Sequence, residues 1–139
     1  MEACQEVTIR PAIGWNESHA RFLAPAISCD PGATVETLKR LVKKRQAQLF
    51  EVLAGSYVVA CYVLQIEQRD NGAEGVIVAA GGKLQGVSLL RTVLPHIERQ
   101  FIGCRWLRVE TARKGILREL GKYGFQPKQV LMLKELNNG

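Results

Sequence analysis

The 139-residue sequence has few of the residues that form metal sites or disulfide frameworks. Its four cysteines are far apart and include no CxxC pair, and its two histidines do not have the spacing of metal ligands. These residues are Cys4, Cys29, Cys61, Cys104, His19 and His96. A zinc site is therefore not expected, and the cysteines are interpreted as reduced, buried thiols rather than reactive nucleophiles.

Long hydrophobic runs are also missing. The longest apolar run, residues 57–64 (YVVACYVL), is too short to span a bilayer, which takes about 20 residues, and is typical of a buried strand. The N-terminal segment MEACQEVTIRP contains acidic residues and no apolar core, so it does not have the pattern of a secretory signal. We therefore expect a soluble intracellular protein with no membrane span.

The composition is that of an ordinary globular domain. Hydrophobic residues make up 47% of the chain and charged residues 23%, and neither repeats nor linkers divide it, so we expect a single domain over residues 1–139. The net charge of +6 favours anionic partners, such as cofactor phosphates, acidic substrates or nucleic acid, without choosing among them.

Periodicity and turn residues predict the order β-α-α-β-β-β-α-β-α-β. The three central strands should form an antiparallel meander, and strand 76–80 should be parallel to strand 105–111, with helices on both faces of the sheet. The expected elements are strand 7–10, a helix capped by Asn16 and ended by Pro25, a helix capped by Thr34, strands 50–54, 57–68 and 76–80, helix 84–101, strand 105–111, helix 114–123 and strand 129–136.

The most informative stretch is VIVAAGGKLQGVSLL, residues 76–90. A strand runs into glycines, and a helix begins directly afterwards. Inward-turned backbone N–H groups and the positive end of a helix dipole would form a cradle for a pyrophosphate, to which Lys83 would add a charge. An ordinary strand-to-helix turn explains the same glycines equally well.

Nearly the whole chain resembles the GNAT superfamily of acyl-CoA-dependent N-acetyltransferases. The resemblance is carried by this glycine turn, by the order of the elements, and by the segments LGKYGF (120–125) and VLMLKEL (130–136). The resemblance implies an α/β (α+β) fold, with a mixed central sheet of six to seven strands and about four helices. It also implies that acetyl-CoA binds along the strand and the loop after it. The residues concerned are Ile77, Val78 and Ala79 for the pantetheine arm, and Gly81, Gly82, Lys83, Gln85, Gly86 and Val87 for the pyrophosphate region.

The chain departs from the family pattern at two places, which makes it a degenerate member. Of the loop pattern Arg/Gln-x-x-Gly-x-Gly/Ala only the last glycine is present, as Gly86; the first position is Gly81 and the first glycine is replaced by Leu84. The tyrosine that protonates the leaving thiolate in many members is replaced by Leu120. Tyr123 lies about 60° short of a full helical turn from that position, so we assign it a packing role.

Acetyl transfer to an amine also needs a group that accepts the proton of the amine. Glu110, near the end of the strand after the cofactor helix, is the first candidate base, and Glu67 is the second. Both also fit ordinary surface carboxylates.

One face of the helix after Thr34 is strongly basic. It fits a solvated helix face, the border of a groove for an acidic acceptor, or a surface for nucleic acid. The residues are Lys39, Arg40, Lys43, Lys44 and Arg45.

Two functions follow from the resemblance. The first is an N-acetyltransferase that uses acetyl-CoA and a small-molecule or protein amine in the cytoplasm. The alternative is a non-catalytic GNAT-fold interaction protein that acts in an oligomer or assembly. Short degenerate chains of this kind also resemble bacteriophage proteins, some of them structural proteins of the virion.

Overall fold

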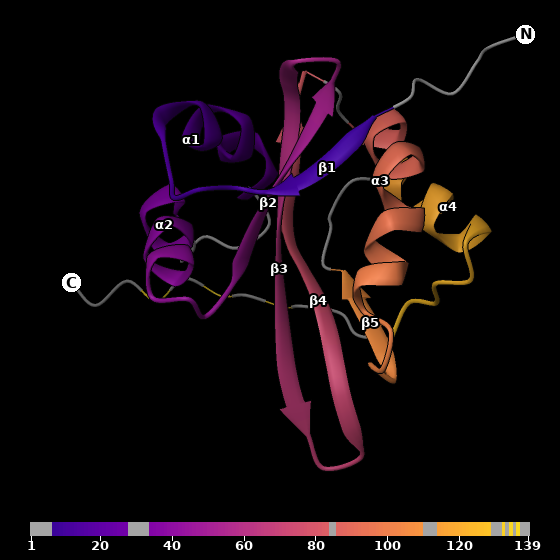
Figure 1. Cartoon of the computed structure of the whole chain (residues 1–139). Coiled ribbons are helices and arrows are strands. Elements are labelled where there is room, and N and C mark those ends of the chain that lie inside the picture. Colours follow the sequence, from indigo (N-terminus) through magenta and orange to yellow (C-terminus); the bar gives the residue numbers. More distant parts are fainter. Residues whose placement is uncertain are drawn as a thin grey trace, which may run out of the picture.

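The computed structural model describes residues 7–27, 34–83, 86–109 and 114–128, together with Met132, Lys134 and Leu136. The elements follow one another in the predicted order as far as the description extends (Figure 1). They are β1 (Thr8–Pro11), α1 (Glu17–Leu23), the 3-10 helix η1 (Ala24–Ile27), α2 (Val35–Lys43), β2 (Gln48–Ala54), β3 (Tyr57–Arg69), β4 (Gly72–Gly82), α3 (Gly86–Gln100), β5 (Trp106–Val109) and α4 (Lys114–Lys122).

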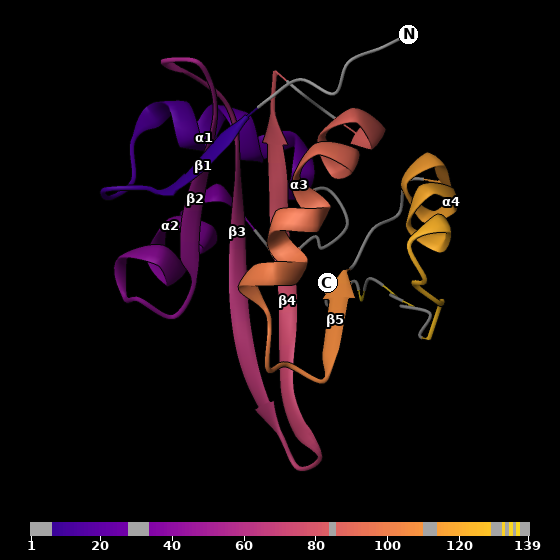
Figure 2. The same cartoon turned by 45° about the vertical axis from the view of Figure 1, so that its right-hand side comes forward.

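The strands form one mixed sheet in the order β1-β2-β3-β4-β5. Neighbours from β1 to β4 are antiparallel, and β5 is parallel to β4, with α3 between them in the chain (Figure 2). The predicted meander and parallel crossover are therefore confirmed. The described residues form five strands, so the expected six to seven overstate the sheet. The additional strand predicted over 129–136 lies outside the described residues, apart from the three isolated positions named above.

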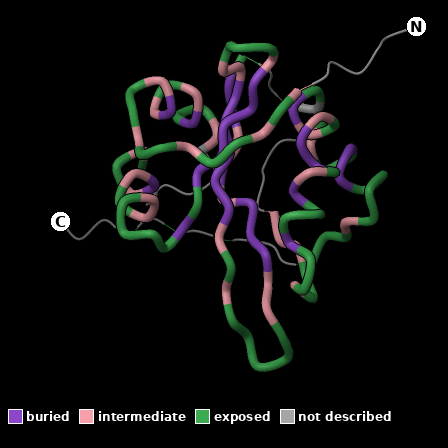
Figure 3. Tube along the Cα trace, in the orientation of Figure 1, coloured by how far each residue is buried: buried purple, intermediate pink, exposed green. Residues whose placement is uncertain are grey.

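Each face of the sheet carries its own hydrophobic core. Alternate side chains of β2 and β3 point to opposite faces, so Phe50 and Tyr62 pack with α3, whereas Leu49 and Val63 pack with α1 and α2. Buried residues follow the middle of the sheet, and the tip of the β3–β4 hairpin is exposed (Figure 3). The mixed sheet with helices on both faces is thus the predicted α/β (α+β) architecture.

The helix boundaries follow from the predicted caps. The Asn16 side chain accepts a hydrogen bond from the His19 N–H at 3.1 Å, and Thr34 caps α2 through the Thr37 N–H at 3.2 Å. Each such cap stabilises a protein by about 1 kcal/mol. The chain leaves the α-helical conformation after Leu23 and continues as η1, which contains Pro25. A proline cannot donate the hydrogen bond that would continue the α-helix.

β4 is longer than the predicted strand 76–80, because it starts at Gly72 and continues through Gly82. Glycine has a low intrinsic preference for strands. Pairing with β3 nevertheless extends along the whole segment, from Arg69↔Gly72 to Ala60↔Gly82. Gly81 and Gly82 are therefore strand residues and not the loop that the sequence indicated.

Candidate active site

The candidate site is an open strand edge where β4 extends past β5. β5 pairs with β4 only from Glu74↔Trp106 to Ile77↔Val109. On that side, the segment from Val78 to Gly82 has no partner strand among the described residues, and Figure 2 shows β5 ending part of the way along β4. A strand edge of this kind presents unpaired backbone N–H and C=O groups to which an extended ligand can bind.

A β-bulge lies where this edge begins. Val63 pairs with Ala79 and Leu64 with Ile77, so Val78 is an extra residue on β4. A bulge bends its strand and increases the local twist. The bend at Val78 follows directly after the last residue that β5 pairs with. The sequence-predicted pantetheine residues are thus placed together: Ile77 is the last residue paired with β5, and Val78 and Ala79 open the free edge.

Gly81 and Gly82 are held by close contacts within the protein itself. A Cβ at Gly81 would overlap the Phe22 carbonyl oxygen of α1, and a Cβ at Gly82 would lie 2.5 Å from the Val59 carbonyl oxygen. Gly82 also has φ 152°, a conformation that side chains rarely adopt. These two glycines therefore have a packing reason that needs no cofactor, and their predicted contact with a pyrophosphate stays a prediction.

Part of the predicted cradle is described and part is not. The Lys83 N–H donates to the Val59 carbonyl at 2.8 Å, so this amide is already used, while the Lys83 side chain is exposed. Gln85 lies outside the described residues. Gly86 and Val87 form the beginning of α3, a helix of 15 residues whose first N–H groups carry partial positive charge. Three residues, 83–85, separate the free edge from this helix start in the sequence.

Of the two candidate bases, only Glu67 is among the described residues. Glu110 is outside the described residues; its neighbour Val109 ends β5 and pairs with Ile77, the residue before the open edge. Glu67 lies towards the β3–β4 hairpin, where it is 2.9 Å from Arg69 and 3.1 Å from Arg108. It pairs in register with Glu74, at the end of the β4–β5 ladder remote from Val78. Its ion pairs give it a structural role, and its catalytic role stays a prediction.

At the position of the family tyrosine, Leu120 is buried, and Tyr123 is partly exposed at the end of α4. The Phe125 N–H donates to the Leu120 carbonyl at 3.2 Å and Gly124 has φ 90°, so Gly124 forms a glycine cap at the end of α4. Glu119 of α4 binds Arg91 of α3 at 2.8 Å. This hydrogen bond from Arg91 lowers the pKa of Glu119 below its ordinary value.

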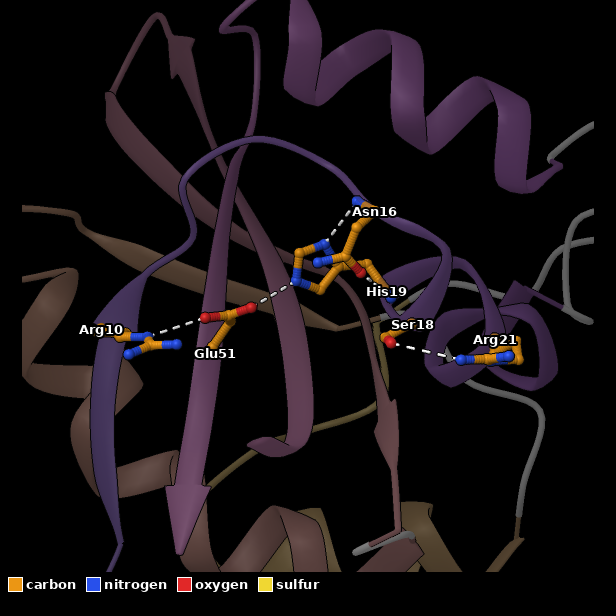
Figure 4. Close-up of polar contacts among 6 residues, drawn as sticks. All are labelled: Arg10, Asn16, Ser18, His19, Arg21 and Glu51. Atoms are coloured by element: carbon orange, nitrogen blue, oxygen red, sulfur yellow. Dashed lines mark hydrogen bonds and ion pairs between the residues drawn. The ribbon is translucent and has the colours of Figure 1, made fainter. Parts of the chain in front are cut away.

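Sequence reasoning missed a buried polar cluster beside the site (Figure 4). His19 of α1 is 1% exposed and its Nε2 lies 2.7 Å from the Glu51 carboxylate of β2, which also accepts a hydrogen bond from Arg10 of β1 at 2.9 Å. Two features of the sequence could have indicated this cluster. Glu51 is the single carboxylate inside the apolar strand 48–54, and His19 lies three residues after the cap Asn16.

The hydrogen bonds of this cluster define the tautomer of His19. Its Nδ1 accepts from the Asn16 N–H at 3.1 Å, so in the neutral ring Nε2 carries the proton and donates to Glu51. Burial alone would raise the pKa of Glu51. The hydrogen bonds from His19 and Arg10 outweigh this effect, and the pKa lies below its ordinary value. Glu51 is therefore an ionised acceptor under neutral conditions.

Register across the paired strands connects this cluster with the open edge of β4. Glu51 pairs with Cys61, and Cys61 pairs with Gly81, over which the Phe22 carbonyl lies. The His19–Glu51 contact thus holds α1 against the sheet, and α1 covers Gly81. Burial and the charge of Glu51 raise the pKa of the free Cys61 thiol to about 12, so Cys61 is a buried neutral thiol, as expected.

No helix in the described ranges is long and apolar enough to cross a membrane. The same residues contain no group of three His, Cys, Asp or Glu side chains that would hold a metal ion.

No family model matches the sequence, and no curated protein matches it either. Solved structures do match. An acetyltransferase from Bacillus subtilis in complex with CoA has a TM-score of 0.67 at 20% identity, covering 89% of this chain and 79% of the other. A transcriptional regulator from Bacillus halodurans has 0.65 at 18% identity (94% and 100% covered). Glucosamine-6-phosphate N-acetyltransferase from Arabidopsis thaliana has 0.55 at 16% identity (95% and 99% covered).

The chain therefore has the fold of the GNAT acetyltransferases, one of which was crystallised with CoA. At these identities the likeness extends to the fold alone.

Proposed function

We propose that this protein is an acetyl-CoA-dependent N-acetyltransferase that transfers the acetyl group to an amine acceptor. The observation that supports the proposal is the open edge of β4 from Val78 to Gly82, which begins at a bulge and is separated from the start of α3 by three residues.

The pantetheine arm has two amides, and an extended chain with amides pairs with a free strand edge as another strand would. In this arrangement the pantetheine arm pairs with Val78 and Ala79 of β4, directly after Ile77, the last residue that pairs with β5. The pyrophosphate then lies towards Gly86 and Val87, where the helix N-terminus favours negative charge. Lys83, exposed between the two, adds a positive charge.

In the transfer, the amine nitrogen attacks the thioester carbonyl, the C–S bond breaks and the acetyl group becomes an amide. The proton of the amine passes to a base, for which Glu110 is the proposed residue. CoA leaves as the thiolate and takes its proton from water, because Leu120 has no proton to donate. Holding the two reactants together in a reactive geometry can lower the barrier by about 7–11 kcal/mol.

The basic face of α2 supports an anionic acceptor. Lys39, Arg40, Lys43 and Lys44 make no ion pair with any described residue, so their charges are available to a ligand. Arg45 follows the end of α2 with φ 60° and does not belong to this face. Nucleic acid would use the same charges. Retention on heparin that survives charge reversal at Lys43 and Lys44 would rule out nucleic acid as the ligand of this face.

At the position of the family tyrosine, the buried Leu120 has no hydroxyl group that could protonate a leaving thiolate. This favours a second candidate, a GNAT-fold protein that binds acetyl-CoA or acts through its surface without transferring the acetyl group. Both cytoplasmic and virion locations are compatible with it.

Thermal unfolding with acetyl-CoA, S-acetylpantetheine and ADP tests the proposal. A ligand at 100 times its Kd stabilises the folded state by about 2.7 kcal/mol. We expect acetyl-CoA to raise the Tm most, S-acetylpantetheine to raise it partly, and ADP alone to have the smallest effect. Release of free thiol from acetyl-CoA with a panel of amines then separates transfer from binding. No Tm shift with millimolar acetyl-CoA contradicts the proposal; a shift without thiol release supports the second candidate.

A further inference from the structure

A cavity of about 250 Å³ lies away from the open edge, where β2 begins and β3 runs on past it. It is lined by the α2–β2 connection, by β2 and β3, and by the end of α3, all located in Figure 1. None of the residues from Val78 to Gly82 lines it, so it is separate from the proposed acetyl-CoA site. The lining residues are Arg45, Gln46, Ala47, Gln48, Phe50, Leu64, Gln65, Ile66, Gln100 and Phe101.

The polar lining consists of one arginine and four glutamines, without a carboxylate. The Gln100 Oε1 accepts a hydrogen bond from the Tyr62 hydroxyl at 2.8 Å, which orients this amide and leaves its NH₂ group as a donor. The amides of Gln46, Gln48 and Gln65 have no side-chain hydrogen bond within the described part of the chain, and neither does the Arg45 guanidinium. The cavity thus offers one positive charge and several unused amides.

Arg45 occupies a backbone position that favours glycine. Its φ is 60°, and it is the non-glycine residue with a positive φ among those described. The Arg45 N–H donates to the Val42 carbonyl and the Gln46 N–H to the Leu41 carbonyl, the hydrogen-bond pattern of a Schellman cap, in which glycine is usual at this place. A strained residue that also lines a cavity points to a function for its side chain.

The apolar part of the lining is partly aromatic. Phe50 stacks on Tyr62 with ring centroids 5.4 Å apart, and Phe101 and Leu64 belong to the same buried cluster. Ile66 is 56% exposed, so the cavity has an apolar wall open to solvent. Small-molecule sites typically combine such an apolar lining with a few convergent polar groups.

We propose that this cavity binds a small organic carboxylate with a planar apolar body. Arg45 pairs with the carboxylate in a two-pronged contact, the glutamine amides bind its polar substituents, and Phe50 and Phe101 contact the planar body. A free ammonium group has no carboxylate to pair with in this lining, so cationic amines are excluded.

The test uses the complete chain labelled with ¹⁵N and three probes of similar shape: benzoate, benzamide and benzylamine. Benzoate is expected to shift the side-chain amide signals of the lining glutamines in a saturable way, benzamide to bind more weakly, and benzylamine to have no effect. Arg45→Gly should weaken benzoate binding at least about tenfold. This substitution suits the positive φ, so a folding defect does not obscure the result.

Arg118→Ala is the matched control, because Arg118 is an exposed arginine of α4 that does not line the cavity. It should leave benzoate binding unchanged within twofold. The proposal is overturned if benzoate causes no saturable shift, if benzylamine binds as well as benzoate, or if Arg45→Gly retains the wild-type affinity. Since no acetyl-CoA is present, the result is independent of the proposed acetyl transfer.

Discussion

Substituting alanine at Gly81 tests whether α1 really packs against the open end of β4. The added methyl group would overlap the backbone carbonyl oxygen of Phe22, and a backbone atom of a helix cannot rotate away as a side chain can. Relief requires α1 to move off the sheet, against the His19–Glu51 contact that holds it. Overpacking of a core costs about 1–3 kcal/mol, and we expect Gly81→Ala to reach the upper half of this range.

Gly115→Ala makes the same chemical change where there is room. An added Cβ at Gly115 in α4 has no other atom within 4 Å, and alanine is the better helix former. This control should be neutral or stabilise the protein by up to about 0.5–1 kcal/mol.

Urea unfolding followed by circular dichroism measures both variants. The Cm should fall for Gly81→Ala and stay or rise for Gly115→Ala, with similar m-values. In thermal unfolding, a loss of about 2–3 kcal/mol corresponds to a decrease in Tm of roughly 7–10 °C for a chain of this size. If the stability of Gly81→Ala is within 0.5 kcal/mol of the wild type, Phe22 does not lie against Gly81 and the packing argument is refuted.

Three further predictions concern stability. The pKa of Glu51 is lower in the folded state than its ordinary value of 4.5, so the ionised carboxylate stabilises the protein above that pH, and this stabilisation is lost as the pH falls through the folded-state pKa. Urea midpoints between pH 3 and 7 should show the loss of stability at low pH. Glu51→Gln should make the urea midpoint less dependent on pH. Arg45→Gly should raise the free energy of unfolding by about 1 kcal/mol, and an unchanged or lower Cm would contradict the strain assigned to φ 60°. Thr34→Ala removes the cap of α2 and should cost about 1 kcal/mol by the same assay, whereas Thr34→Ser should cost little; equal losses would contradict the capping role.

The local elements were predictable because short-range chemistry determines them. Asn16 and Thr34 act at helix ends whatever the tertiary structure, and the short gap between the predicted strands 50–54 and 57–68 indicates a hairpin by itself.

The missed features depend on contacts between distant residues. β4 extends to Gly82 because β3 pairs with it. The glycine at position 81 is explained by Phe22 of α1, and the one at position 82 by Val59 of β3. The partnership of His19 with Glu51 likewise appears only when α1 lies on β2. The residues of the candidate edge were predictable from the family resemblance, but its cause, the early end of β5 beside the bulge at Val78, was not.

The proposed acetyl transfer requires that acetyl-CoA binds at the free edge of β4. The most direct measurement is a titration of the ¹⁵N-labelled protein with CoA, following the backbone amide signals. We predict saturable shifts for Val78 to Gly82 and for the first turn of α3, and none for the hairpin residues near Glu67. Unshifted signals along Val78–Gly82 at millimolar CoA, or shifts confined to other parts of the protein, would contradict the account.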